Sequence, residues 1–386
     1  MTSTEQNRKD KRRKALISVA TAVGLSTLAW AAYQVFIASN YESTDNAYVQ
    51  GNIIQITPHN TGLVQAILAD DTDFVKAGQP LVQLDPADAK VNLAQAEANL
   101  AQTVRQVRSL YANTAALSAQ LELREAEAQR AQQDLQRRQA AADAVSSEEL
   151  AHAQAQLVQA QAAVTAAREQ FASNQALTEG TRLEEHPSVQ AAAARMREAW
   201  LADKRGALLA PADGVVAHRT VQVGQRVAPG TPLMSVVPLK QVWVDANFKE
   251  VQLRHIRIGQ PVEVNADVYG HTVNYHGTVA GLGAGTGTAF ALLPAQNATG
   301  NWIKVVQRVP VRIALDPKEL NEHPLRVGLS MNVSVDVSHQ DGPLLTESQR
   351  TEPVAQTQTY SPFAPEADAQ VRRVIEANAG VQAKAH

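Results

Sequence analysis

The ten histidines are the residues in this sequence best suited to metal chemistry, because neutral imidazole is a common metal ligand. A helical metal site places two histidines four residues apart, whereas His271 and His276 lie in a strand-like or loop-like region without that spacing. Cysteine is absent, which excludes disulfides, thiolate metal sites and cysteine nucleophiles. We therefore assign the histidines structural roles on the surface and expect no metal ligands.

Phosphate-binding and acid–base chemistry are also not indicated. The glycine-rich stretch GLGAGTG (Gly281–Gly287) fits neither G-x-G-x-x-G nor G-x-x-x-x-G-K, and no helix pattern follows it. Acidic pairs such as Glu148 and Glu149 fall on exposed positions without any sign of a pocket. The stretch is therefore predicted to be a flexible loop, and we expect no catalytic residue and no cofactor. Nucleic acid is excluded as a partner by the net charge of −3 and the aromatic content of 4%.

The N-terminus indicates a membrane anchor. A basic cluster, RKDKRRK (Arg8–Lys14), precedes an uncharged apolar run over residues 15–38. As a helix this run would extend about 36 Å, enough to cross the roughly 30 Å core of a bilayer. The positive-inside rule then predicts a cytoplasmic tail over residues 1–14, a single-pass helix over 15–38 and an exported remainder. The alternative is a cleaved signal peptide, since Ala29-Trp30-Ala31 fits a small-x-small cleavage site.

One pattern is written twice in the exported part. GLVQAILADDTDFVKAG (Gly62–Gly78) and GVVAHRTVQVGQRVAPG (Gly214–Gly230) share glycine at both ends and valine at two matched positions. Each copy reads as about four short strands, too few to bury a face alone. We predict that the two copies face each other in a barrel-sandwich (lipoyl-like) domain built from residues 45–87 and 207–238. Gly62, Gly78, Gly214 and Gly230 are predicted to be structural turn glycines.

Between the copies, residues 88–206 are nearly free of helix breakers, and apolar residues alternate at spacings of three and four. The first arm carries this seam from Leu93 to Leu135, and the second from Leu150 to Phe171. Ser146 and Glu149 form a capping box that starts the second arm, and Gly180 and Pro187 interrupt it. These features predict a long antiparallel coiled-coil hairpin.

Alternating strands return over residues 239–338 and predict a small β-barrel with a short helical turn near KEVQLRHI. Residues 339–386 are polar and proline-rich, so we predict a flexible tail with a short helix at DAQVRRVIEANAG. The predicted fold is therefore an elongated α+β chain. Its parts are an N-terminal transmembrane helix, a split sandwich, a coiled-coil hairpin and a barrel on the C-terminal side.

Two half-motifs split by a coiled coil and preceded by one anchor resemble the HlyD-type membrane fusion proteins, also called periplasmic adaptors. The stretches TDNAYVQGNIIQITPHNTGLV and GTGTAFALLPAQNATGNWIKVVQRVPVRI are similar to the EmrA-type multidrug-efflux adaptors, and the resemblance covers about residues 10–340. It implies an adaptor without catalytic activity, held by one helix in the inner membrane of a Gram-negative cell, with its N-terminus cytoplasmic and its bulk periplasmic. It also implies a trimer or hexamer that links a proton-driven major-facilitator transporter to a TolC-type outer-membrane channel.

In this family the hairpin tip contacts the channel, and many relatives carry Arg-x3-Leu-x6-Ser there. That motif is absent here. Counted back from Ser146, the position of the motif's leucine holds Gln139 and the position of its arginine holds Leu135. The tip is therefore assigned by position. It comprises Arg138, Ala142, Asp143, Val145, Ser146, Ser147 and Glu149.

Two alternatives remain. The same adaptor could serve an ABC-driven type I protein secretion system. A lipoyl or biotinyl carrier would also contain the β half-motifs, but it needs a modifiable lysine in the tight turn that joins them. The nearest lysine here is Lys90, which falls within the predicted first helix.

Overall fold

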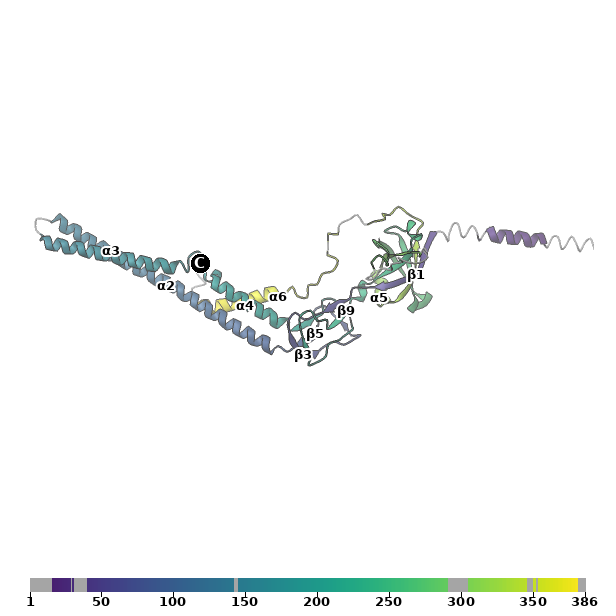
Figure 1. Ribbon diagram of the computed structural model, residues 1–386, viewed down its shortest axis with the longest axis horizontal. Coiled ribbons are helices and arrows are strands. Elements are labelled where there is room, and N and C mark those ends of the chain that lie inside the picture. Colours follow the sequence, from purple (N-terminus) through teal and green to yellow (C-terminus); the bar gives the residue numbers. More distant parts are fainter. Residues whose placement is uncertain are drawn as a thin grey trace, which may run out of the picture.

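The computed structural model describes residues 16–28, 30, 40–141, 145–290, 305–345, 350–351 and 353–380. The chain is elongated, with a helical hairpin at one end, a small sandwich in the middle and a barrel beyond it (Figure 1). A helix over residues 16–28 lies beyond the barrel, at the end opposite the hairpin. This order agrees with the elongated α+β organisation expected from the sequence.

The barrel is closed and antiparallel. Around it run β1 (Tyr41–Gln50), β10 (Trp243–Lys249), β13 (Arg308–Leu315), β12 (Asn274–Leu282), β11 (Pro261–Ala266) and β14 (Ser330–Asp336). Short helices connect the strands: η4 (Leu239–Gln241), η5 (Gln252–Arg254), η6 (Asp267–Thr272) and α5 (Pro317–Glu322). Alternate residues fill the interior, including the fully buried Phe248, Ile313 and Tyr275. Burial raises the pKa of Tyr275 to about 12, and its hydroxyl donates to the carbonyl of His323 at 2.9 Å.

The barrel begins earlier in the chain than the sequence indicated. The predicted sandwich half started at residue 45, but residues 45–50 belong to β1, which pairs with both β10 and β14 and closes the barrel. Only Ala47 and Val49 of this ten-residue strand are buried. A strand with two buried side chains carries too weak an alternating pattern to show which sheet it joins.

The sandwich contains two sheets. One has the order β2 (Ile54–Ile56), β9 (Met234–Val237), β7 (Gly214–Ala217) and β4 (Phe74–Val75). The other has the order β6 (Ala207–Leu209), β5 (Pro80–Leu84), β3 (Gly62–Ile67) and β8 (Arg226–Val227). The prediction that the copies face each other is therefore corrected, because each sheet takes strands from both copies.

The repeat is a true structural two-fold. Positions in the two copies correspond at an offset of 152 residues, so that Gly62, Phe74 and Val82 match Gly214, Arg226 and Met234. When each strand is exchanged for its counterpart in the other copy, the strand order of the first sheet becomes that of the second. Hydrogen bonds repeat in the same way. The Gly78 amide donates to the Ala210 carbonyl at 2.8 Å, and its equivalent, the Gly230 amide, donates to the Pro58 carbonyl at 3.3 Å.

The four glycines of the motif have two different roles. Gly78 and Gly230 have φ of +81° and +82°, as a turn glycine requires. Gly62 and Gly214 instead begin strands β3 and β7, so the prediction of turns at these two positions is wrong. At Gly214 a side chain is excluded by crowding, because an added Cβ atom would lie 2.6 Å from the Val237 carbonyl oxygen.

The hairpin is formed by α2 (Ala87–Ala140), α3 (Ser147–Gln175) and α4 (Pro187–Lys204), with η3 (Leu183–Glu185) between the last two. The predicted capping box is present: the Ser146 hydroxyl accepts from the Glu149 amide, and the Glu149 carboxylate accepts from the Ser146 amide. Gly180, with φ of +75°, and Pro187, in the first turn of α4, lie at the predicted interruption.

Residues 353–380 are not a free tail, which corrects this part of the predicted flexible tail over residues 339–386. Helix α6 (Phe363–Ala379) packs against α2 and α4 at the hairpin base, where Val371 and Ile375 are buried (Figure 1). The preceding segment crosses the sandwich, since the Thr357 hydroxyl donates to the Pro211 carbonyl at 2.7 Å. Burial there raises the pKa of Tyr360, whose hydroxyl donates to the Leu209 carbonyl at 3.2 Å.

The predicted membrane segment lies partly outside the described residues. Of residues 15–38, the structure describes 16–28 as an exposed helix, together with residue 30. Within the described parts of the chain, no helix is both long enough and apolar enough to span a membrane.

Candidate functional site: the hairpin, its tip and its base

The hairpin seam follows the predicted heptad positions. Every seam residue from Leu93 to Leu135 is buried or half-buried, and so is every seam residue of the second arm. At 54 residues, α2 extends about 80 Å. Small alanines in the seam let the helices approach closely, and Arg168 of α3 bonds Glu125 of α2 at 2.9 Å across the pair. The arrangement is a long, narrow rod.

A polar cluster that the sequence reasoning missed fixes α2 to the α3–α4 break. The Asn174 side-chain amide donates to the Thr114 hydroxyl at 2.6 Å and accepts from Asn113 at 2.9 Å. The Tyr111 hydroxyl donates to the Thr181 carbonyl at 2.6 Å. Thr114 stands at a position of the otherwise apolar seam, and a polar residue there is the sequence signal of a register-setting contact. The cluster holds the second arm in place where its helix is broken.

Replacing Asn174 by alanine is expected to lower the local stability of the break by about 1–2 kcal/mol, because it removes the hydrogen bonds that join Asn174 to Thr114 and Asn113 across the helices. Amide hydrogen exchange over residues 172–182 measures this change. Ser173→Ala on the exposed neighbouring position is the control and should leave exchange unchanged. Equal exchange in both variants would contradict a positioning role for the cluster.

The tip presents mostly exposed polar groups. Ser146, Ser147 and Glu149 are exposed, whereas Val145 and Arg138 are half-buried. Arg138 bonds Asp134 at 2.8 Å, and its guanidinium also donates to the Glu149 carbonyl at 3.5 Å, which joins the two arms below the turn. Ala142 and Asp143, also assigned to the tip, lie outside the described residues. The described tip offers hydroxyls and carboxylates to a partner.

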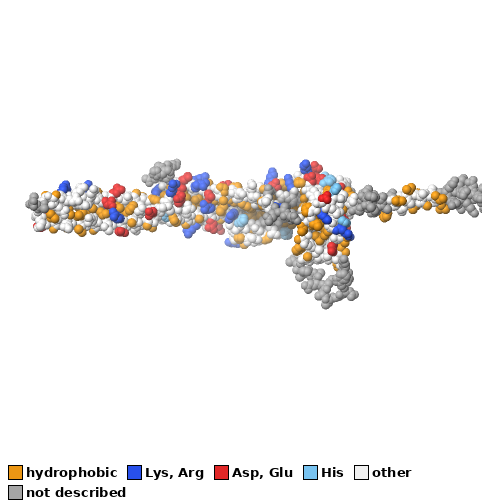
Figure 2. Space-filling model, turned by 90° about the horizontal axis from the view of Figure 1, so that it is seen from above, with side chains coloured by type: hydrophobic (Ala, Val, Ile, Leu, Met, Phe, Trp, Pro, Cys, Tyr) orange, Lys and Arg blue, Asp and Glu red, His pale blue; other side chains and the backbone are white. Residues whose placement is uncertain are grey.

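The base of the hairpin is a bundle of α2, α4 and α6. Its core contains Leu100, Val104, Met196 and Ile375. Its edge is closed by an ion pair between Arg197 of α4 and Asp368 of α6 at 2.5 Å. Figure 2 shows charged side chains of both signs scattered over this region, without a large patch of one sign. The bundle therefore thickens the rod where it meets the sandwich.

His276, one of the histidines considered for metal chemistry, has a structural partner. His276 bonds Glu319 of α5 at 2.7 Å, and this hydrogen bond raises the pKa of His276. In the part of the chain that the structure describes, no group of three histidine or acidic side chains could hold a metal ion. Lys90 is exposed within α2, not in a turn between the sandwich halves. Arg219 joins the two halves by bonding Asp70 at 2.6 Å, which lowers the pKa of Asp70.

Comparisons with known proteins agree with this architecture. A family model described as the EmrA alpha-helical hairpin domain matches residues 87–206, and an AAEA-like beta-barrel domain model matches residues 241–336. The chain is 44% identical over 350 residues to "Multidrug export protein EmrA" of Escherichia coli (strain K12), covering 90% of each. It is 48% identical over 342 residues to "Fatty acid resistance protein FarA" of Neisseria gonorrhoeae, covering 88% of this chain and 87% of that protein.

A solved structure titled "Structure of the periplasmic adaptor protein EmrA" aligns with 77% of this chain and 98% of that chain, at 20% identity and a TM-score of 0.38. The fold and the family matches together define a non-enzymatic structural adaptor, in which a helical rod rises from a split sandwich beside a barrel. More narrowly, the chain belongs to the family of EmrA-type membrane fusion proteins.

Proposed function

We propose that this chain is the periplasmic adaptor subunit of a tripartite multidrug efflux pump. In this proposal it links a proton-driven major-facilitator transporter of the inner membrane to a TolC-type outer-membrane channel. The observation that carries the proposal is the rigid hairpin, about 80 Å along α2, rising from a sandwich whose two halves it separates. The match over nine-tenths of a relative named as a multidrug export protein supports drug efflux as the process served.

The proposed assembly has one inner-membrane anchor over residues 15–38, with the basic residues 1–14 in the cytoplasm. Several copies associate, as a trimer or a hexamer, so that their hairpins stand side by side and their tips meet the channel. The exposed hydroxyls and carboxylates at Ser146, Ser147 and Glu149 are the proposed contacts. No group in the adaptor needs to react; its contribution is geometric.

Channel contact is tested with single cysteines, because the chain has none of its own. Ser147→Cys, labelled with a benzophenone maleimide in cells, is expected to crosslink to an outer-membrane protein on irradiation. Val223→Cys, 63% exposed on the sandwich, is the control and should yield no such product. If Ser147 captures nothing from the outer membrane while cells still export drug, the tip assignment is wrong.

The type of transporter is tested by co-purification and by the energy source of export. A major-facilitator partner predicts that a membrane protein without an ATP-binding cassette co-purifies with the adaptor. It also predicts that a protonophore stops dye efflux in cells whose ATP is maintained. Co-purification of an ATP-binding cassette protein, with export that survives the protonophore, would favour the type I secretion alternative.

A further inference from the structure

One end of the barrel differs from the other in what it presents to solvent. The sandwich lies beyond the opposite end, where Gln50 pairs with Trp243. At the end where β1 begins, Tyr41 pairs with Asp336, and Lys249 pairs with Arg308. We call this second end the β1 face. It comprises Lys249, Val251, Arg254, Phe290, Val305, Val306 and Arg308.

Large apolar side chains are exposed on the β1 face. The exposed fractions are 59% for Val251, 73% for Phe290, 64% for Val305 and 55% for Val306. The four residues come from two neighbouring connections, because the Glu250 amide donates to the Gln307 carbonyl at 3.1 Å. Large apolar side chains that are exposed together at one end of a barrel indicate a surface that is covered by a membrane or by another molecule.

Cations stand beside these apolar residues. Lys249 and Arg308 are cross-strand neighbours, and Arg254 is exposed on η5. Carboxylates also lie at this end, among them Glu42, Asp45, Glu250 and Asp336, so the surface is mixed in sign. Lysine and arginine beside exposed apolar residues suit a phospholipid surface, where cations bind phosphate and apolar groups enter the acyl boundary.

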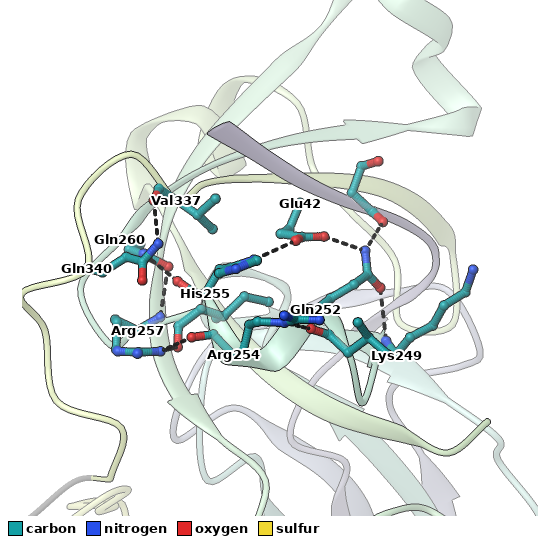
Figure 3. A network of polar contacts seen from close by, with 12 residues as sticks. Glu42, Lys249, Gln252, Arg254, His255, Arg257, Gln260, Val337 and Gln340 are labelled. Carbon is teal, nitrogen blue, oxygen red and sulfur yellow. Dashed lines mark hydrogen bonds and ion pairs between the residues drawn. The ribbon is translucent and has the colours of Figure 1, made fainter. Parts of the chain in front are cut away.

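A hydrogen-bond network at the β1 face ties the first strand to η5 and to the segment after β14 (Figure 3). Glu42 of β1 bonds His255 at 3.0 Å and accepts from the Gln252 amide at 2.9 Å, which ties the first strand to η5. Gln260 donates to the carbonyls of His255 and His339, at 3.0 Å and 2.7 Å. The entry strand, η5 and the segment after β14 therefore move as one unit.

The length of the chain limits how far this face can lie from the proposed anchor. The apolar run ends at residue 38, and β1 begins at Tyr41. Three residue steps span at most about 10 Å even when fully extended. The barrel also holds the entry point, since the Val337 amide donates to the Asn40 carbonyl at 2.8 Å. An anchored chain thus has its β1 face at the depth of the lipid headgroups.

We propose that the β1 face is a membrane-docking surface, with the phospholipid bilayer as its occupant. Val251, Phe290, Val305 and Val306 enter the interfacial region, and Lys249, Arg254 and Arg308 contact lipid phosphates. Because β1, η5 and β14 are locked together, this contact sets the tilt of the barrel against the membrane. The inference rests on the proposed anchor over residues 15–38.

The test places the full-length chain in vesicles of phosphatidylethanolamine and phosphatidylglycerol, without any transporter. Val251→Cys carries an environment-sensitive fluorophore, and the vesicles contain a lipid with a nitroxide in its headgroup. Emission from position 251 is expected to shift to the blue and to be quenched at least about threefold more than from labelled Val223→Cys on the sandwich. Adding Phe290→Ser and Val306→Ser to the Val251→Cys chain is expected to abolish most of that quenching.

The possible results separate the docking surface from the anchor. A chain that floats with the vesicles but shows equal quenching at positions 251 and 223 would remove the docking surface and leave the anchor intact. A chain that does not float with the vesicles would remove the anchor, and with it the docking surface. Quenching that appears only after a transporter is added would assign the β1 face to a protein contact and overturn the proposal for lipid.

Discussion

Replacing Ile375 by aspartate is expected to release α6 from the hairpin base and to destabilise the base bundle by about 3–4 kcal/mol. Ile375 is 6% exposed and packs in a cluster that includes Leu100, Val104 and Met196. A carboxylate there would be desolvated without a cationic partner, and the apolar contacts of the isoleucine would be lost. Both effects favour the undocked helix over the docked one.

Hydrogen exchange at the amides of α4 measures this release, since α4 loses its cover when α6 leaves. Arg372→Asp adds the same carboxylate three residues earlier, on the exposed side of α6, and should leave exchange in α4 unchanged. Arg197→Ala provides a milder variant. It removes the ion pair to Asp368, which is partly exposed on both sides and is expected to contribute no more than about 1 kcal/mol. Unchanged exchange in Ile375→Asp would contradict the docked position of α6.

The C-terminal segment illustrates what a sequence pattern can and cannot predict. The stretch DAQVRRVIEANAG was predicted to be helical, and all of it except the final Gly380 lies within α6. Its period of apolar residues shows that one face must be covered but not what covers it. The partners are α2 and α4, which end at Ala140 and Lys204, and they are brought there by the fold of the intervening domains. The surrounding polar and proline-rich composition therefore led to the wrong prediction of a flexible tail.

The hairpin was predictable because its information is local. A seam with spacings of three and four specifies both the helix and the face that meets its neighbour, and one capping box specifies where the second arm begins. Strand β1 shows the opposite case, because its place in the barrel depends on pairing with strands about 200 and 290 residues later. The contacts of the tip with a channel depend on another molecule, so the assignment of Ser146, Ser147 and Glu149 stays a prediction.

Replacing Gly214 by alanine is expected to destabilise the sandwich by about 3 kcal/mol, whereas Gly62→Ala should cost less than about 1 kcal/mol. The two glycines are equivalent under the two-fold of the repeat, and each begins a strand. Their surroundings differ. A Cβ atom at Gly214 would lie 2.6 Å from the Val237 carbonyl oxygen, which is held in a strand, and 2.8 Å from Val236 Cγ1. At Gly62 the nearest atom is Leu84 Cδ1 at 3.2 Å, at the free end of a side chain.

This matched pair separates backbone crowding from backbone conformation. Gly78→Ala and Gly230→Ala are the second pair, because both have φ near +80° and no atom within 4 Å of an added Cβ. If the strain of a left-handed backbone is the only effect, each substitution lowers the free energy of unfolding by a similar amount, about 1–2 kcal/mol. Hydrogen exchange of the β5 and β9 amides reads out the stability of the two sheets separately from the barrel and the hairpin. Equal costs at Gly62 and Gly214 would mean that the β7–β9 edge relaxes as freely as the Leu84 side chain. The close approach at Val237 would then not be the reason that glycine stands at position 214.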